Sequence, residues 1–178
     1  MIISDGQREE NFQEYLRLLK NPNYVDVCFD ERSGGVSAVH LEHQFDKSTG
    51  PFGYKRGQYE LDTMIALRQS GHSIILEPEL SSGETVSKSC DGFLDGVSAE
   101  IKAVESVGRW SIRTKIYKAK KQGAQTVILY FPEENLFSKS RVEQGLEDFV
   151  SADTGTEYKL HLLCVVGGKV VEIEKPSW

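Results

Sequence analysis

Apolar residues recur at helical spacing in four segments of the chain, and between these segments they alternate with polar residues or form short runs. A repeat of three to four residues is typical of an amphipathic helix, whereas alternation and short runs are typical of strands. Stop signals at Asn21-Pro22, Gly71 and Gly123 end the first three of these segments. The pattern therefore predicts helices over residues 7–20, 58–70, 108–122 and 140–150.

The apolar positions also predict which face of each of the first two helices is buried. In both helices these positions repeat every three or four residues and so line up on one side. They are Phe12, Tyr15, Leu16 and Leu19 in the first helix and Leu61, Met64, Ile65 and Leu67 in the second. We expect these side chains to face the core. On the third helix, Ile112, Ile116 and Ala119 are the corresponding positions.

Short apolar runs bounded by turn residues predict the strands. The run over 125–131 is typical of a central strand that is buried on both faces. Asp95-Gly96 is a strong signal for a two-residue hairpin, and Gly34-Gly35 and Gly167-Gly168 predict further turns. Outside the Asp95-Gly96 hairpin, the predicted strands cover 24–29, 36–40, 72–77, 125–131, 160–166 and 169–173, with loops over 44–57 and 78–89. This order predicts an α/β fold with a mixed central sheet flanked by helices.

Composition places the chain among ordinary globular proteins. Its 178 residues, 39 % hydrophobic and 27 % charged, predict one domain spanning 1–178. Neither a membrane span nor a secretory signal is visible, so we expect a cytoplasmic protein that has no membrane partner. The three cysteines, Cys28, Cys90 and Cys164, are scattered, which is typical of reduced thiols and argues against a zinc site.

The net charge of −6 is unevenly distributed. Residues 106–132 hold six basic side chains and no acidic one, so the remaining 15 basic and 27 acidic residues leave −12 elsewhere. Two interpretations of this basic segment are open. It forms either a solvated helix face or a surface that binds phosphate groups. In the second case, Arg113, Lys118, Lys121 and Gln122 are the expected substrate-binding residues.

Three charged residues of the predicted hairpin share one face. With Asp95-Gly96 as the loop, Asp91 is directly opposite Glu100, and opposed residues point to the same side of a sheet. Lys102 lies two positions beyond Glu100 and points to that side as well. Two adjacent carboxylates repel, which either raises the pKa of one of them or favours a cation between them. We expect Lys102 to pair with Glu100 when no metal is bound.

Oxygen ligands at this spacing suit Mg²⁺ or Mn²⁺, which polarises a phosphoryl oxygen, and a nearby lysine can stabilise charge in the transition state. The alternative is an exposed hairpin face with a simple Glu100–Lys102 pair. Glu60, in the first turn of the second helix, is either a surface residue favoured by the helix dipole or a further acid of the same site.

Other residues with catalytic chemistry are weaker candidates. His40 and His43 are expected at a strand end and in the loop after it, on opposite faces and without a metal-binding role. His72, at the start of a predicted strand, and His161, within another, are expected to be core or surface residues without a catalytic role. The hydroxyl residues Ser106 and Thr114 lack a His or Asp partner at the spacing of a catalytic triad, so a hydrolase triad is not expected.

The order of elements around these residues resembles the PD-(D/E)XK nuclease superfamily, whose core runs helix–strand–strand–strand–helix–strand. That core has an Asp on its second strand and Glu-x-Lys on its third, as do Asp91 and Glu100-Ile101-Lys102 here. The resemblance covers about residues 52–131, leaving 1–50 as an N-terminal helix and hairpin extension and 132–178 as a last helix and closing hairpin. One departure is Cys90, where the motif has Pro.

Within this superfamily, the chain is most similar to the C-terminal tRNase domains of contact-dependent growth inhibition toxins and to their phage or mobile-element relatives. The features that carry this similarity are Gly57-Gln58-Tyr59-Glu60, Leu67 followed by Gly71-His72, and Asp91-Gly-Phe-Leu-Asp-Gly before Glu100.

The resemblance implies a restriction-endonuclease-like core and a metal-dependent endonuclease that hydrolyses phosphodiester bonds in nucleic acid, with tRNA as one expected substrate. Asp91 and Glu100 would ligate Mg²⁺ or Mn²⁺, Lys102 would activate water, and Glu60 would orient that water or support the metal ligands. An immunity protein is then an expected partner. Two alternatives stay open, namely a non-catalytic interaction module of a phage or mobile element and an immunity-type binding domain. The intact set of Asp91, Glu100 and Lys102 favours the enzyme.

Overall fold

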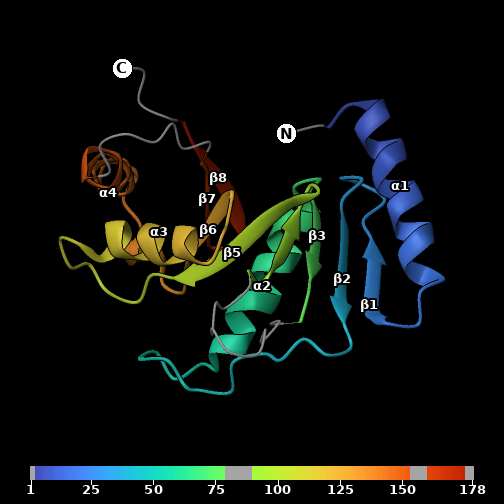
Figure 1. Cartoon of the computed structure of the whole chain (residues 1–178), viewed down its shortest axis with the longest axis horizontal. Coiled ribbons are helices and arrows are strands. Elements are labelled where there is room, and N and C mark those ends of the chain that lie inside the picture. The colour runs from blue at the N-terminus through green and yellow to red at the C-terminus, as the bar shows by residue number, and fades with distance from the viewer. Residues whose placement is uncertain (1–2, 79–89, 153–159, 175–178) are drawn as a thin grey trace.

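A computed structural model describes residues 3–78, 90–152 and 160–174. Figure 1 shows how the helices and strands within these residues are arranged. In chain order they are α1 (Asp5–Leu19), β1 (Tyr24–Phe29), β2 (Val36–His40), α2 (Arg56–Gln69), β3 (Ser73–Leu76), β4 (Gly92–Leu94), β5 (Val97–Ala103), α3 (Ser111–Lys121), β6 (Thr126–Phe131), the 3₁₀ turn η1 (Glu134–Leu136), α4 (Lys139–Ala152), β7 (His161–Val166) and β8 (Lys169–Ile173).

All the described strands belong to one mixed sheet, in which they follow each other in sequence order from β1 to β8. The pairs β2–β3, β5–β6 and β6–β7 are parallel, and the other neighbours are antiparallel. Each parallel pair needs a crossover connection, and α2, α3 and α4 supply these three crossovers. The predicted mixed α/β class is thus confirmed, and the predicted N-terminal hairpin and closing hairpin form the two ends of the sheet.

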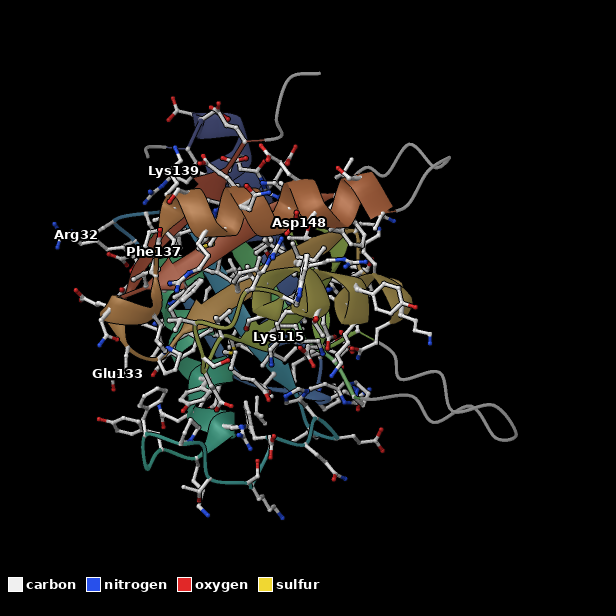
Figure 2. The ribbon with its side chains drawn as sticks, turned by 90° about the vertical axis from the view of Figure 1, so that its left-hand side faces the viewer. Arg32, Lys115, Glu133, Phe137, Lys139 and Asp148 are labelled. Atoms are coloured by element: carbon white, nitrogen blue, oxygen red, sulfur yellow. The ribbon has the colours of Figure 1, made fainter. Side chains whose placement is uncertain are left out.

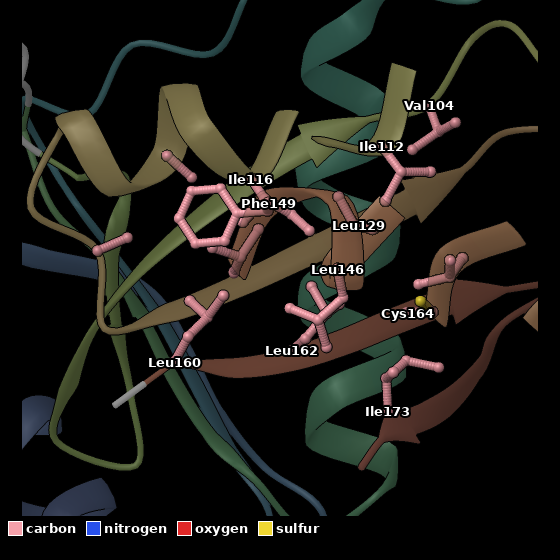
Figure 3. Packing of buried hydrophobic residues seen from close by; sticks show 14 of the residues in the cluster. Val104, Ile112, Ile116, Leu129, Leu146, Phe149, Leu160, Leu162, Cys164 and Ile173 are labelled. Carbon is pink, nitrogen blue, oxygen red and sulfur yellow. The ribbon is translucent and has the colours of Figure 1, made fainter. Parts of the chain in front are cut away.

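Helices cover both faces of the sheet. On β6, Val127 and Leu129 pack in the same cluster as Ile116 of α3 and the buried residues of α4 (Figure 3). The residue between them, Ile128, packs on the other side in a cluster with Leu67 of α2. Because successive side chains of a strand point to opposite faces, α2 lies on one face and α3 and α4 lie on the other. The apolar run of β6 is therefore buried on both sides, as predicted.

The buried face of α1 differs from the predicted one. Phe12 and Leu19 are exposed, whereas Leu18 is fully buried against β2 and β3, and Asn11 is buried as well. The Asn11 amide donates to the carbonyl oxygens of Gly34 at 2.8 Å and Gly71 at 3.1 Å. A polar side chain is therefore accommodated inside because both of its donors find acceptors, which shifts the inward face of the helix.

The inward face of α2 is also only partly as predicted. Met64 and Leu67 are buried, but Ile65 is exposed. In its place Tyr59 and Thr63 are buried, and the Thr63 hydroxyl donates to the Tyr59 carbonyl oxygen at 2.7 Å. That local hydrogen bond allows a polar residue on the inner face. On α3 the three predicted positions are all buried.

The Asp95-Gly96 hairpin forms as predicted. Leu94 pairs with Val97 and Gly92 with Ala99, and both turn residues adopt positive φ angles, +50° at Asp95 and +78° at Gly96. This backbone suits a two-residue turn of type I′, for which glycine at the second position is favoured.

Three strands, β1, β2 and β8, keep their predicted boundaries, and the other boundaries move by at most three residues. The largest change is at α3, which begins at Ser111 rather than 108. The predicted loop over 78–89 falls outside the described residues apart from its first position. Among the helices in the described ranges, each is too short or too polar to cross a lipid bilayer.

Candidate active site

Asp91 and Glu100 are locked together by two reciprocal hydrogen bonds at the base of the β4–β5 hairpin. The Asp91 amide donates to Glu100 Oε2 at 2.9 Å, and the Ile101 amide donates to Asp91 Oδ2 at 2.7 Å. Asp91 precedes β4 and lies outside the strand ladder, so these bonds replace the simple cross-strand pairing that the register predicts. Both carboxylates are thereby held in fixed positions.

Lys102 completes this group from the same side of β5. Its Nζ atom donates to Glu100 Oε1 and also to Gln122 Oε1, the latter at 2.8 Å. The predicted Glu100–Lys102 pair is therefore present. Glu100 is only 2 % exposed, and Lys102 is half-buried. A charge as deeply buried as Glu100 needs a partner, and Lys102 supplies it.

Burial and the proximity of Glu100 raise the pKa of Asp91 to about 7. Glu60 adds to this effect, while the Ile101 amide and the Lys102 ammonium oppose it. Two acidic groups in one partly dry site resist double ionisation, because the second negative charge is repelled by the first. A cation bound next to Asp91 would therefore favour the ionised form of Asp91, and the ionised carboxylate would in turn stabilise the cation.

A histidine that the sequence interpretation set aside lies in this region. His43, in the loop after β2, places its Nε2 atom 2.8 Å from Glu60 Oε2 on α2 and its Nδ1 atom 2.8 Å from the Glu77 carbonyl oxygen. The Glu77 amide in turn donates to the Asp91 carbonyl oxygen at 2.9 Å. The backbone of Glu77 thus links the His43–Glu60 pair to the hairpin carboxylates.

The charge state of His43 follows from these contacts. Burial by itself would lower the pKa of His43, but the hydrogen bonds to Glu60 and Glu77 and the charges of Glu60 and Asp91 outweigh burial and raise it. A carbonyl oxygen can only accept, so Nδ1 carries a proton, and a proton on Nε2 suits the Glu60 carboxylate. The arrangement therefore favours the imidazolium form.

The sequence gives no periodic signal for the His43 contact. His43 lies 17 residues before Glu60, and the predicted loop 44–57 separates them. The one usable signal is chemical, since a histidine is a natural hydrogen-bond partner for a carboxylate such as Glu60. As predicted, His40 ends the strand and His43 follows in the loop, but His43 contributes to the site.

The predicted substrate-binding residues on α3 do not form one set. Gln122 follows the last helical residue, and its side-chain oxygen is occupied by Lys102, so it positions that lysine. Lys118 and Lys121 are exposed, and Arg113 is half-buried with its guanidinium 5.5 Å from the centre of the Trp110 ring.

Lys115, which was not among the predicted site residues, is half-buried on α3. Burial lowers the pKa of its ammonium group, and the charges of Lys118 and Lys102 lower it further, against the attraction of Glu105. The positive charges of α3 therefore extend to the Lys102 end of the candidate site.

Two further histidines pair with carboxylates outside the candidate site, and Cys90, beside Asp91, is a protonated thiol. His72 Nδ1 lies 2.7 Å from Asp95 Oδ2 beside the hairpin turn, and His161 Nε2 lies 2.8 Å from Glu172 Oε1 across the β7–β8 pair. Cys90 neighbours Asp91, but burial and the two hairpin carboxylates raise the pKa of its thiol to about 11. Cys90 is thus a protonated thiol at neutral pH and not a thiolate ligand.

The donor set fits a hard divalent cation in a limited way. Within residues 3–78, 90–152 and 160–174, no three His, Cys, Asp or Glu side chains form a ready group for a metal. Asp91 and Glu100 offer two neighbouring carboxylates, and Mg²⁺ is commonly held by one or two carboxylates while it keeps several waters. The raised pKa of Asp91 reflects its burial and the negative charge of the neighbouring Glu100, and a bound cation would compensate that charge.

Comparison of the chain with protein-family models, with curated proteins and with solved structures finds no match.

Proposed function

We propose that this protein is a metal-dependent endonuclease of the PD-(D/E)XK type that hydrolyses phosphodiester bonds in nucleic acid. The observation that carries the proposal is the hydrogen-bonded group of Asp91, Glu100 and Lys102. The pKa of Asp91 is raised, Asp91 is hydrogen-bonded to the buried Glu100, and Glu100 is paired with Lys102. Such a group is suited to bind a cation and to stabilise negative charge.

The order of the elements that hold these residues supports the same proposal. Helix α2 precedes β3, β4 and β5, and α3 and β6 follow, with β6 parallel to β5. This is the helix–strand–strand–strand–helix–strand order expected of a restriction-endonuclease-like core. Asp91 leads into the second of these strands, and Glu100 and Lys102 lie on the third.

In the proposed reaction, a water oxygen forms a bond to phosphorus and one phosphorus–oxygen ester bond breaks, which yields a phosphate monoester end and a hydroxyl end. Asp91 and Glu100 would hold Mg²⁺ or Mn²⁺, which supplies Lewis-acid chemistry at a phosphoryl oxygen. Lys102 would stabilise the negative charge that develops on the phosphoryl group, and Gln122 would fix the direction of its ammonium group.

His43 and Glu60 take supporting parts in this proposal. The Glu60 carboxylate is oriented by His43, which the Glu77 carbonyl oxygen holds in turn. Glu60 would orient the attacking water by accepting a hydrogen bond from it. His43 acts through Glu60 and is a positioning residue.

The test is single-turnover cleavage of tRNA, single-stranded DNA and duplex DNA in Mg²⁺, in Mn²⁺ and in EDTA. Cleavage of at least one substrate is expected with metal and not with EDTA. Glu100→Gln is expected to abolish it, because the exchange removes a negative charge from the cation site and leaves Lys102 with an uncharged partner.

A matched control is Glu172→Gln. It removes an exposed cross-strand carboxylate that is also paired with a basic side chain, His161, but on the β7–β8 hairpin and without a contact to Asp91, Glu100 or Lys102 among the described hydrogen bonds and ion pairs. This variant is expected to cleave like the wild type. Absence of cleavage of all three substrates under every metal condition would overturn the proposal and leave the non-catalytic interaction module as the better description.

A further inference from the structure

Two exposed aromatic rings on α3 stand among its basic side chains. Trp110, directly before the helix, is 46 % exposed, and Tyr117 is exposed to a similar degree at 54 %. Trp110, Tyr117 and Lys121 are spaced by seven and four residues, so they project from one side of the helix. That side is opposite the buried positions Ile112, Ile116 and Ala119.

Cations accompany both rings. The Arg109 guanidinium carbon lies 4.5 Å from the centre of the Trp110 ring and that of Arg113 lies 5.5 Å from it. Lys121 Nζ lies 5.9 Å from the centre of the Tyr117 ring. Aromatic faces with adjacent cations offer stacking platforms beside phosphate-binding charges, which is the composition that single-stranded nucleic acid requires.

We propose that this side of α3 binds an unpaired stretch of nucleic acid, with bases stacked on Trp110 and Tyr117 and phosphates at the surrounding lysines and arginines. Bases in a duplex are already stacked on each other and paired. They are therefore not free to stack on an exposed aromatic side chain of the protein. The two rings are separated by about 10 Å along the helix, given a rise of 1.5 Å per residue, and thus contact separate bases.

The charge distribution favours this occupant. The segment 106–132 contains six basic residues and no acidic residue, in a chain with a net charge of −6. A polyanion is therefore attracted to α3 and repelled by most of the remaining surface. Figure 2 shows α3 next to α4, with Lys115 labelled on α3.

The surface leads toward the proposed catalytic group. Lys118 is one turn before Gln122, whose side chain contacts Lys102. A strand that crosses the aromatic side of α3 would therefore continue past Lys118 to the Asp91–Glu100 carboxylates. In this respect the inference rests on the proposed function, because it names the substrate of that site as single-stranded or locally unpaired. The binding surface itself is tested without cleavage.

The experiment measures binding in EDTA, where cleavage is absent, to fluorescent single strands of twelve thymidines or twelve uridines and to a duplex of equal length (about one helical turn). Single strands are expected to bind more tightly than the duplex, and comparison of the two single strands distinguishes DNA from RNA. Tyr117→Ala and Trp110→Ala are each expected to weaken single-strand binding at least about fivefold.

Tyr117→Phe keeps the ring and is expected to bind like the wild type. Tyr54→Ala is the matched control, since Tyr54 is 55 % exposed but lies in the loop before α2. In a Trp178→Phe background, which leaves Trp110 as the single tryptophan, single strands are expected to quench the fluorescence.

Equal affinity for duplex and single strand, or unchanged affinity of both aromatic variants, would overturn the inference while leaving metal-dependent cleavage intact. Equally strong binding of polyglutamate would overturn it in favour of an acidic protein partner. Ring-dependent binding without any cleavage in Mg²⁺ or Mn²⁺ would support the inference and refute the proposed endonuclease.

Discussion

Lys102 Nζ donates to Gln122 Oε1 at 2.8 Å, so the charged group of the hairpin is tied to the carboxyl end of α3. Without this contact, the ammonium group would be held by Glu100 alone. The two acceptors together fix the direction in which the charge points. They belong to consecutive elements of the chain, so the orientation of Lys102 depends on how α3 packs against β5.

Replacement of Lys102 by alanine is expected to lower single-turnover cleavage about 100-fold or more, because one preorganised electrostatic contact to the transition state is lost. Substrate affinity should change much less. The melting temperature is expected to fall, because the buried Glu100 carboxylate loses its charged partner, but the fold should persist since β5 stays anchored by Ile101 and Ala99 in the core. The experiment measures the single-turnover cleavage rate, the substrate affinity in EDTA and the melting temperature of Lys102→Ala and of the wild type. A well-folded Lys102→Ala protein with near-normal cleavage would remove Lys102 from the site.

Replacement of Asp91 by alanine is expected to weaken the binding of Mg²⁺ or Mn²⁺ at least tenfold, or about 1.4 kcal/mol. The cause is the loss of one of two carboxylates that are held next to each other by reciprocal hydrogen bonds to backbone amides. Isothermal titration calorimetry measures the dissociation constants directly. Equal affinity in the wild type and in Asp91→Ala would show that the metal does not bind at this pair.

The stability of the metal-free protein is expected to fall as the pH rises through the pKa of Asp91. That pKa is raised from an ordinary value of 3.8 to about 7, so between these values the folded protein binds more protons than the unfolded chain. Where the folded state binds the extra proton, the free energy of unfolding decreases with increasing pH. The variant Asp91→Asn keeps the size and shape of the side chain but has no carboxyl group that titrates, so it serves as the reference.

Thermal unfolding in EDTA tests this sign. The melting temperature of the wild type, relative to that of Asp91→Asn, should be lower at pH 8 than at pH 5. Added Mg²⁺ should stabilise the wild type more at pH 8, where Asp91 is ionised, than at pH 5. A difference between the two proteins that is constant with pH would contradict the raised pKa.

Removal of two exposed charges from α3 should change the salt dependence of nucleic-acid binding. We assume that Lys118 and Lys121 each neutralise one phosphate. The double variant Lys118→Ala/Lys121→Ala is then expected to reduce the magnitude of the slope of log K against log salt concentration by about 1.4 for a single strand and about 1.8 for a duplex. Fluorescence anisotropy at several salt concentrations gives this slope. An unchanged slope would assign this helix to solvent or to a protein partner.

Much of the fold is predictable because strong local signals coincide with the tertiary structure. The apolar run of β6 and the Asp95-Gly96 turn each permit few arrangements, and both appear as predicted. Once the turn is known, the alternation of side chains places Glu100 and Lys102 on one side of β5. The shared face of these two residues therefore follows from the sequence, and Asp91 joins them through its hydrogen bonds.

The contacts that the sequence does not predict depend on residues brought together from separate elements. His43 meets Glu60 only because the loop after β2 returns along the start of α2. Gln122 reads as a helix-end residue facing solvent or phosphate, and its contact with Lys102 depends on how α3 packs. The exposed side of Phe12 and the buried side of Asn11 likewise reflect which acceptors lie near the helix, which hydropathy does not report.

The buried amide of Asn11 has a consequence for how the amino-terminal part of the chain opens. Its two donors hold the carbonyl oxygens of Gly34, before β2, and Gly71, before β3. If α1 detached from the sheet, both carbonyl oxygens would lose their hydrogen bond to Asn11 in the same event. The segments that lead into the parallel strands β2 and β3 would then become more mobile together. In native-state hydrogen exchange, the amides of α1 and those at these two strand entrances should therefore exchange as one cooperative unit.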